Sequence, residues 1–233
     1  KNILILSDLF NFMRRNKREK IDSFVNYVLN YIDKLIKEKN TIIIPTYNFN
    51  FFQTRETNLE ISSITTGYLN KRIVEKFDFQ RTHRPIYNYA IIGPNTRELC
   101  DLKQTTAWGK DSVIGFLSMN EKSKAIGIGI DPNNFGWVTI HVCEEFFQVP
   151  YRYFKNFRGY NKDFKKEVCE RMYVKKLSYK KIINQSLISL HLKKKKKIKQ
   201  EKICGVDFSS IFLFDYFRQG LDILNNNPYA LLK

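Results

Sequence analysis

The chain has 233 residues, 43% of them hydrophobic and 15% aromatic, and its formal net charge is +17. The length suits one large domain, and the apolar content is enough for a buried core, which excludes a globally disordered chain. The longest apolar runs are too short to span a bilayer and no signal-peptide pattern opens the chain, so we expect a soluble, cytoplasmic protein without a membrane partner.

The first part of the chain is typical of strands alternating with helices. Short apolar runs predict strands at residues 2–6 and 41–44. Between these strands, residues 18–37 predict a helix with one apolar face, formed by Ile21, Phe24, Val25, Val28, Leu29, Ile32 and Ile36. A second helix is expected after them, through Tyr68, Leu69, Ile73 and Val74, with Ser62 or Ser63 as its cap.

The same alternation continues to residue 147. We expect strands at residues 89–92 and 124–130 and helices at residues 95–102 and 138–147. The glycines of the strand at 124–130 indicate a close approach of backbone or ligand. Strands that alternate with helices imply a layered α/β domain.

The last third of the chain differs in character. Residues 151–202 are polar and basic and end in the run Lys193–Lys197, which we expect in a solvated loop or hairpin. A nucleic-acid-binding arm is the alternative for this run. Residues 206–224 are apolar again and predict a helix that packs back on the domain.

The positive charge is concentrated in this last third. Residues 1–150 hold 20 basic and 16 acidic residues, whereas residues 151–233 hold 20 basic and 7 acidic ones. Such a field attracts phosphate-bearing partners, among them nucleic acid, anionic membrane, coenzyme A and a nucleotide diphosphate sugar. Because the chain is rich in Lys, Asn, Ile and Phe throughout, compositional bias is an equally good explanation.

The cysteine pattern argues against a metal or disulfide framework. The four cysteines are irregularly spaced and form no Cys-x-x-Cys pair. We therefore expect free thiols and no metal site.

Among three histidines, His141 has the most informative surroundings. It stands three residues before Glu144 and four before Glu145, so on a helix either carboxylate can reach its ring. A carboxylate there would hold one imidazole nitrogen and leave the other free to accept a proton. A surface or capping pair is the alternative explanation for this spacing.

Cys143 offers a competing route through an acyl-cysteine intermediate. Two helical residues are about 200° apart around the axis, so Cys143 and His141 should point in opposite directions. We expect Cys143 to be a buried structural thiol.

Four ordered blocks of the sequence resemble the aminoglycoside 3-N-acetyltransferase family, or antibiotic acetyltransferases. They are residues 42–47 (IIIPTY), residues 81–88 (RTHRPIYN), residues 106–112 (TAWGKDS), and a block from Gly127-Ile128-Gly129 through Thr139, His141 and Glu144 to Pro150-Tyr151-Arg152. The resemblance covers about residues 2–159.

This resemblance implies an α/β fold, a layered α/β/α sandwich with a mixed central sheet. Residues 1–159 would form an acetyl-CoA-binding catalytic core, and residues 160–233 a basic C-terminal extension whose helix packs back on that core, in one domain overall. The implied partners are small molecules rather than nucleic acid, and a homodimer is one option for the assembly.

The resemblance also implies the chemistry. Acetyl-CoA would be the donor and a primary amine the acceptor, with His141 as general base and Glu144 as its acidic partner. Backbone N–H groups or the Thr139 hydroxyl could stabilise the oxyanion that forms. Contacts to the cofactor are implied for Ser7, Arg81, Thr106, Gly109 and Ser112, and contacts to the substrate for Asp8, Tyr47, Asn88, Tyr151, Arg152 and Lys155.

Several positions depart from the antibiotic enzymes. Arg84 stands in place of a His, Asn88 in place of a Ser and Trp108 in place of a Phe, and Leu6-Ser7-Asp8-Leu9 replaces His-Ser-Ser-Leu. The stretches after Arg81 and Tyr151 look more like relatives in bacterial surface-polysaccharide (lipopolysaccharide) pathways, which acetylate an amino sugar on a nucleotide diphosphate. The net positive charge suits such an anionic substrate.

We therefore expect N-acetylation of a nucleotide-linked amino sugar, such as a dTDP-3-amino-3,6-dideoxyhexose, with aminoglycoside acetylation as the alternative. A basic nucleic-acid-binding module is a more distant alternative, and the absence of aromatic residues from Lys193–Lys197 counts against it. An inactive partner-binding scaffold is a further alternative, against which the intact Thr139, His141 and Glu144 argue.

Overall fold

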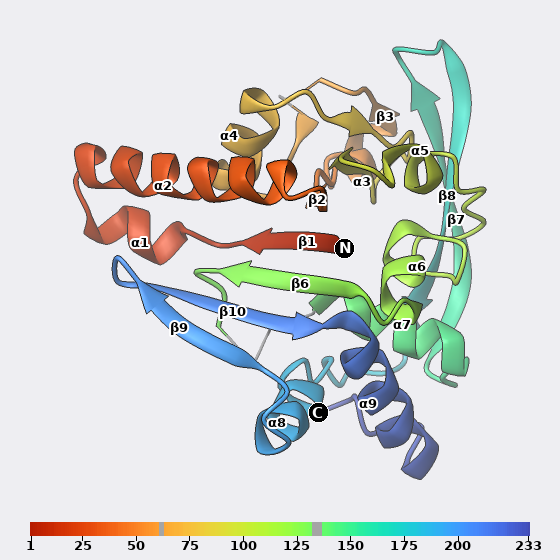
Figure 1. Cartoon of the computed structure of the whole chain (residues 1–233). Coiled ribbons are helices and arrows are strands. Elements are labelled where there is room, and N and C mark those ends of the chain that lie inside the picture. Colours follow the sequence, from red (N-terminus) through yellow and green to blue (C-terminus); the bar gives the residue numbers. More distant parts are fainter. Residues whose placement is uncertain (61–62, 132–136) are drawn as a thin grey trace.

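The computed structural model describes residues 1–60, 63–131 and 137–233. At its centre is a mixed sheet with strand order β4-β5-β2-β1-β6-β10-β9 (Figure 1). The parallel part consists of β2 (Thr41–Pro45), β1 (Asn2–Ser7) and β6 (Ser123–Ile128). Antiparallel strands extend it on both sides, namely β5 (Tyr89–Ile92) with β4 (Gln80–Arg81), and β10 (Val206–Phe212) with β9 (Lys199–Ile203).

Side chains on the parallel strands alternate between two apolar cores. On β1, Ile3 and Ile5 belong to one core and Leu4 to the other. Because both faces are covered, these strands appear in the sequence as continuous apolar runs. Helices α2 (Arg18–Lys37) and α4 (Tyr68–Lys76) cover one face, and α6 (Val113–Met119), α7 (Trp137–Phe147) and α9 (Leu213–Asn226) cover the other, which gives the three layers seen in Figure 1.

The long helix α2 (Arg18–Lys37) has the bounds that its periodicity predicts. Its buried face differs from the expected one at a single position, because Leu35 is buried where Ile36 was expected. The short helix α1 (Phe10–Arg15) precedes it.

Helix α4 (Tyr68–Lys76) contains the four apolar residues expected of it, but its predicted cap is wrong. Gly67 occupies the N-cap at a φ of 100°, a conformation that favours glycine. Ser63 lies outside the helix, and Ser62 lies outside the described residues.

The opposite layer is formed by α6 (Val113–Met119), α7 (Trp137–Phe147) and α9 (Leu213–Asn226). The prediction of one helix over residues 206–224 is wrong in its first half, where β10 pairs with β6. Central strands bury residues on both faces, so Phe208 and Ile211 give an apolar run that resembles a buried helix.

A second, small sheet of order β3-β7-β8 stands beside the first. It is dominated by a long hairpin of β7 (Arg152–Asn161) and β8 (Lys166–Lys175), which the sequence analysis did not predict. The short strand β3 (Glu56–Thr57) runs parallel to β7, and the short helices α3 (Phe51–Thr54) and α5 (Thr96–Cys100) complete this side (Figure 1).

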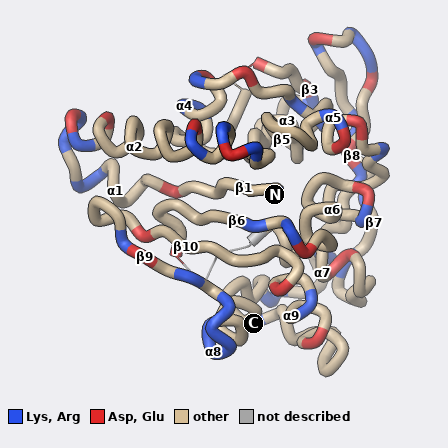
Figure 2. The backbone as a smooth tube through the Cα atoms, viewed as in Figure 1, with Lys and Arg blue, Asp and Glu red and all other residues tan. Residues whose placement is uncertain are grey.

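The lysine run lies at the end of α8 (Ser186–Lys194) and in the turn before β9. Figure 2 shows the resulting concentration of positive charge on α8. Lys197 of the run is paired, because its Nζ lies 3.3 Å from Asp215 Oδ1. The run is therefore partly helical rather than a loop or hairpin.

The C-terminal third is interleaved with the rest of the chain. Residue 159 falls within β7, and β10 occupies a place in the central sheet next to β6. Helix α9 packs on α6 and α7. No helix among the described residues is long and apolar enough to cross a membrane.

Candidate active site

His141 and Glu144 form the pair that the sequence predicts. Both lie on α7, and His141 Nδ1 is 2.7 Å from Glu144 Oε2. The Glu144 side chain is fully buried, and the His141 side chain is 17% exposed. With Nδ1 directed at the carboxylate, Nε2 is the ring nitrogen left to accept a proton.

Arg152 and Tyr151 at the start of the hairpin complete the surroundings of this carboxylate. Arg152 Nη2 lies 2.7 Å from Glu144 Oε2 and 3.0 Å from His141 Nδ1, and Tyr151 donates its hydroxyl to Glu144 Oε1 at 2.9 Å. Arg152 Nη1 also donates to the Tyr173 carbonyl at 2.7 Å. Two residues expected to bind substrate therefore hold the partner of the base.

These contacts set the charge states at the pair. Burial raises the pKa of Glu144, but the hydrogen bond and charge of His141 and the charge of Arg152 outweigh it and hold this pKa below 4.5. Burial lowers the pKa of His141 from 6.5, and Arg152 lowers it further against the opposing effect of Glu144. The carboxylate is thus ionised and the imidazole neutral at neutral pH.

Trp108 packs directly on the imidazole of His141. Its ring centroid is 4.6 Å from that of His141, and the Arg152 guanidinium lies 5.9 Å from the Trp108 ring centroid. Tyr87 meets the other edge of the indole at 5.2 Å. His141 is consequently held by a carboxylate on one side and an aromatic ring on the other.

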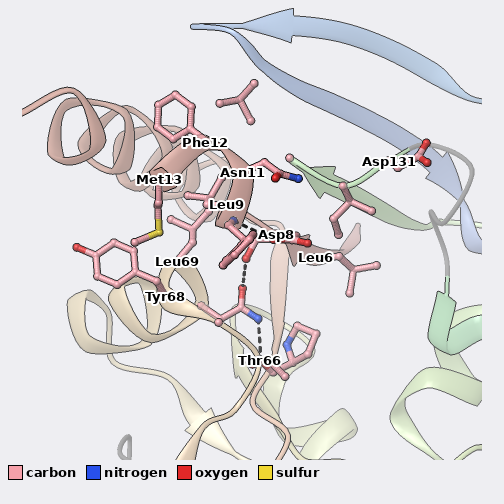
Figure 3. Close-up of a pocket in the computed structure, with 18 of the residues that line it drawn as sticks. Leu6, Asp8, Leu9, Asn11, Phe12, Met13, Thr66, Tyr68, Leu69 and Asp131 are labelled. Carbon is pink, nitrogen blue, oxygen red and sulfur yellow. Dashed lines mark hydrogen bonds between the residues drawn. The ribbon is translucent and has the colours of Figure 1, made fainter. Parts of the chain in front are cut away.

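A cavity of about 1150 Å³ opens in front of His141. Its wall includes Ser7 at the end of β1, Asp8 just after it, Tyr47 after β2 and Asp131 after β6, at the carboxyl ends of the three parallel strands (Figure 3 labels Asp8 and Asp131). Ligands bind at this end of open α/β sheets. Gly129, at a φ of 71°, leaves no room for a Cβ beside the Asp8 carbonyl, so the ends of β1 and β6 approach closely.

Polar contacts order the wall of this cavity. Ser7 Oγ donates to Asn70 Oδ1 at 2.7 Å, and Asn70 Nδ2 donates to the Pro45 carbonyl at 3.0 Å. The Asp8 side chain accepts the backbone N–H of Phe10 at 2.9 Å, at the start of α1. Ser7, Asp8, Tyr47 and His141 are the predicted site residues that line the cavity.

Two other predicted residues are engaged elsewhere. Burial lowers the pKa of Arg81 to about 10, and its guanidinium donates to the carbonyls of Leu59 and Thr46 and to the Asn88 side chain. Asn88 is buried in the same cluster. Both brace loops beneath the site, and neither lines the cavity.

Thr139 and Lys155 also lie off the cavity wall. Thr139 is buried on α7, and its hydroxyl has no hydrogen-bond partner among the described residues. Lys155 is exposed on β7, with its amine 5.3 Å from the centroid of the Phe157 ring. The structure thus does not bring these two side chains together with the cavity residues.

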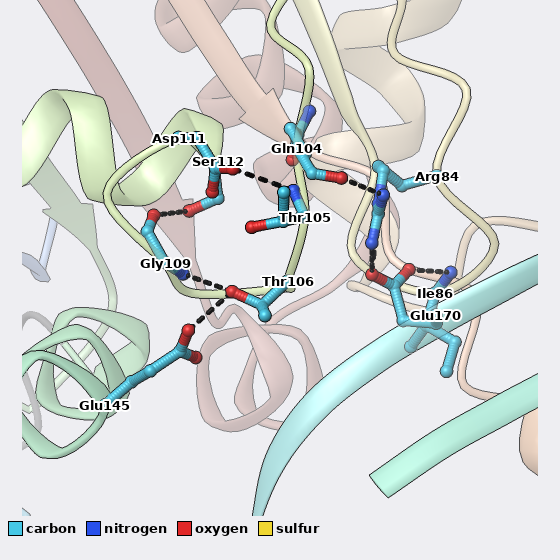
Figure 4. A network of polar contacts seen from close by, with 10 residues as sticks. All are labelled: Arg84, Ile86, Gln104, Thr105, Thr106, Gly109, Asp111, Ser112, Glu145 and Glu170. Carbon is cyan, nitrogen blue, oxygen red and sulfur yellow. Dashed lines mark hydrogen bonds and ion pairs between the residues drawn. The ribbon is translucent and has the colours of Figure 1, made fainter. Parts of the chain in front are cut away.

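The residues 106–112 form a self-contained loop (Figure 4). The Thr106 hydroxyl donates to Glu145 and accepts the N–H of Gly109 at 2.9 Å, and Ser112 Oγ donates to the Gly109 carbonyl at 2.7 Å. Ser112 also caps α6 by accepting the N–H of Gly115. These three predicted cofactor residues are used in holding the loop.

The sequence analysis missed the carboxylates Asp131 and Asp207 and the indole of Trp108. Asp131 and Asp207 line the cavity, and Asp207 precedes the β10 residue Phe208, which pairs with Ile128 of β6. Recognising β10 as a strand would have placed Asp207 there. Trp108 stood out only as a replacement for Phe. Within the part of the chain that the structure describes, no group of three or more potential metal ligands comes together.

No protein-family model matches the sequence, and no curated protein matches it. Solved structures do match. A histidine-to-alanine mutant of aminoglycoside acetyltransferase AAC(3)-IVa in complex with gentamicin superposes with a TM-score of 0.73 at 15% identity, over 100% of this chain and 84% of that one. Aminoglycoside acetyltransferase AAC(3)-IIb gives 0.75 at 12% identity, over 97% and 91%.

The chain has the acetyltransferase fold. The YokD protein from Bacillus subtilis shares it, with a TM-score of 0.70 at 12% identity over 97% of this chain and 87% of that one. The predicted α/β sandwich with a mixed sheet is therefore confirmed.

Proposed function

We propose that this chain is an acetyl-CoA-dependent N-acetyltransferase that acts on an amine of a cationic amino sugar. The observation that carries the proposal is the buried Arg152–Glu144–His141 arrangement, which presents a neutral imidazole at a large cavity. The fold shared with aminoglycoside acetyltransferases supports the same class of reaction.

The proton chemistry follows from the contacts of His141. Glu144 holds Nδ1, so Nε2 takes a proton from the neutral acceptor amine as the lone pair of the amine nitrogen bonds to the acyl carbon. The ionised Glu144 stabilises the imidazolium that results, and Arg152 keeps that carboxylate ionised. The proton then leaves with the departing thiolate sulfur, which restores neutral His141.

The donor fits the site in size and charge. The cavity exceeds the range of about 300–1,000 Å³ that one drug-sized ligand needs, so it has room for parts of two substrates. Arg15 and Lys202 line it and are suited to hold phosphate groups, and Ser7 is the one predicted cofactor residue on its wall. When bound, acetyl-CoA would supply the electrophilic thioester carbonyl and a thiol leaving group.

The acceptor class follows from the carboxylates. Among the described residues, Asp8, Asp131 and Asp207 line the cavity together with the two basic side chains of Arg15 and Lys202. Carboxylates attract ammonium groups and repel diphosphates. Although the whole molecule has a charge of +17, the local wall favours a polycationic amino sugar over the nucleotide-linked sugar expected from the sequence.

The comparisons support the same choice. AAC(3)-IVa was solved with gentamicin and AAC-VIa with sisomicin. The aminoglycoside alternative therefore has support from relatives in fold, whereas the nucleotide-linked sugar rests on sequence stretches alone.

A thiol-release assay with acetyl-CoA and a panel of amines tests the proposal. We expect turnover with aminoglycosides and little or none with dTDP-linked amino sugars. The reverse order would reject the cationic acceptor, and mass spectrometry without an added acetyl group on any amine would reject the acetyl-transfer function.

The carboxylates can be tested separately. We expect Asp8→Asn to raise KM for a multiply charged aminoglycoside while leaving KM for acetyl-CoA unchanged, because the amide can still accept the Phe10 N–H. Asp101→Asn, on an exposed carboxylate after α5, is the matched control. Equal KM values for Asp8→Asn and wild type would remove Asp8 from acceptor binding.

A further inference from the structure

We propose that Glu145 is a positioning residue that acts through Thr106 to hold Trp108 against the imidazole of His141. The inference rests on the proposed function for its catalytic consequence. Its structural part, the orientation and shielding of His141 by a clamped indole, can be measured without any substrate.

Glu145 has a different task from its neighbour Glu144. It lies one helical turn after His141 on α7, and its Oε1 accepts the Thr106 hydroxyl rather than an imidazole N–H. Its side chain is buried, and Oε2 has no hydrogen-bond partner among the described residues. A buried carboxylate with only one of its two oxygens hydrogen-bonded destabilises the fold. We therefore look for a functional role in its one hydrogen bond, to Thr106.

The unfavourable burial of Glu145 is reflected in its pKa. Burial raises the pKa of Glu145 above 4.5, and the charge of Asp111 raises it further, against the lowering effect of the Thr106 hydrogen bond. Glu145 is thus a second acid near His141, in an environment that disfavours its charged form. Its hydrogen bond with Thr106 is the contact that this position provides.

The Thr106 hydroxyl is fully used. It donates to Glu145 and accepts the N–H of Gly109, so it joins α7 to both ends of the turn that carries Trp108. The turn continues through Ser112 into α6, and Asp111 Oδ2 accepts the Thr105 N–H at 3.0 Å (Figure 4).

The turn from Thr106 to Ser112 is tightly packed. A Cβ on Gly109 would collide with the Thr106 hydroxyl, and a Cβ on Gly115 would collide with the Gly109 carbonyl. The loop backbone therefore has one position relative to α6 and α7, and the indole between Thr106 and Gly109 inherits it.

The consequence at the base is direct. Trp108 is 3% exposed and packs on His141, Tyr87 and Arg152. An indole fixed there restricts rotation of the imidazole about its side-chain bonds and keeps water from that face of the ring. A base held in a productive orientation needs no reordering during the reaction.

The groups that act on the charge of His141 come from several elements. Glu144 belongs to its own helix and Arg152 to β7. Tyr87 packs on the indole, and Asp8 and Asp131 line the same cavity as His141. Asp111 belongs to the 106–112 loop, and Glu145 of α7 is bonded to that loop through Thr106. Each remains in place in the variants below except Glu145 where it is itself changed.

The experiment compares Thr106→Val, which removes the hydroxyl while keeping the shape, with Thr106→Ser, which keeps it. NMR titration of the His141 imidazole in the protein without ligand is the first readout, with His141→Asn identifying its signal among three histidines. We expect the pKa of His141 to rise toward 6.5 in Thr106→Val, because water reaches the ring, and to stay low in Thr106→Ser.

The second readout is kinetic. A base that is misoriented loses turnover rather than affinity, so we expect kcat to fall by about 10–100-fold in Thr106→Val with KM for acetyl-CoA little changed. Glu145→Gln, whose amide oxygen can still accept the hydroxyl, should retain most of the activity that Glu145→Ala loses.

A double-mutant cycle with Trp108→Leu isolates the route. If Thr106 acts through the indole, Thr106→Val adds no further rise in the pKa of His141 in the Trp108→Leu background. An unchanged His141 titration in folded Thr106→Val, or full additivity with Trp108→Leu, would overturn the inference. Absence of acetyl transfer in the wild type would instead reject the proposed function and leave the titration result standing.

Discussion

At the scale of single residues, Glu144 explains why this histidine can act as a base. Its Oε2 atom lies 2.7 Å from both His141 Nδ1 and Arg152 Nη2, and its Oε1 accepts the Tyr151 hydroxyl. A buried carboxylate with three donors stays charged. That charge orients the imidazole, while burial, together with the charge of Arg152, keeps the pKa of His141 below 6.5.

Removal of the imidazole should therefore abolish turnover without loss of the fold. We expect His141→Asn to lower kcat by at least about 100-fold, the lower range for general base catalysis, while CoA binding remains measurable by calorimetry. Cys143→Ala should keep near-normal kcat, because the thiol is buried and contacts the Phe217 carbonyl. A reversed pattern, with an active His141→Asn and an inactive Cys143→Ala, would instead indicate a covalent route.

The pH dependence of kcat/KM reports the same base. Because the folded pKa of His141 is lowered from 6.5, activity should be constant above pH 6.5 and fall only as the pH drops through the lower folded value. In that window the unfolded chain binds the extra proton, so stability also falls as the pH decreases. Glu144 adds a further loss of stability below pH 4.5, for the same reason. An acid limb centred above pH 6.5 would contradict this assignment.

At the scale of elements, the contact between α7 and α9 is set by a glycine. A Cβ at Gly220 would stand 2.5 Å from Cys143 Sγ and 3.1 Å from Ile188 Cδ1. The thiol thus fills the space that a larger residue at position 220 would need. This contact backs the helix that carries His141 and Glu144.

A double-mutant cycle on these two residues should show strong coupling. Gly220→Ala alone should destabilise the protein by about 1–3 kcal/mol, the usual cost of overpacking, despite the better helix propensity of alanine. In the Cys143→Ala background the same change should cost less, since the sulfur has gone. Thermal unfolding of the wild type, the two single variants and the double variant measures the coupling. Additive effects would mean that α7 and α9 can move apart to accommodate the added methyl group without contact with the thiol.

Elements with a clear period were predictable from the sequence. α2 and β5 have the predicted bounds, because a 20-residue helix with one apolar face and a four-residue buried strand leave few alternatives. β10 was mistaken for a helix because its residues are buried on both faces. The β7–β8 hairpin was missed because charged and polar residues interrupt both strands, so neither strand shows a regular apolar alternation.

The same distinction applies to the candidate site. The His141–Glu144 contact is local on one helix and followed from spacing. Arg152, Trp108 and Asp207 reach the site from β7, a loop and β10, so only tertiary structure brings them to it. Thr106, Gly109 and Ser112 were predicted to bind cofactor, and in the structure they hydrogen-bond to one another within their loop and, through Thr106, to Glu145 of α7.

At the scale of the whole molecule, charge is separated from the cavity. The lysine run begins in the last turn of α8, whereas Gln185, just before the first turn of that helix, lines the cavity. Nine helical residues span about 13 Å, which exceeds the Debye length of about 8 Å at physiological ionic strength. The net charge of +17 therefore says little about the acceptor, while the cavity carboxylates say more.

Neutralising part of the run tests this separation. Lys194, Lys195 and Lys196 are exposed, and changing all three to Gln lowers the formal net charge by three, from +17 to +14. We expect a change in unfolding free energy within about 0.5 kcal/mol, as for most surface substitutions, and an unchanged kcat/KM for aminoglycosides at physiological salt. At low salt, where screening is weak, the variant should show a higher kcat/KM than wild type, because it repels a polycationic acceptor less. A fall in kcat/KM at physiological salt would instead place these lysines in substrate binding, and a rise in KM confined to acetyl-CoA would assign them to the donor.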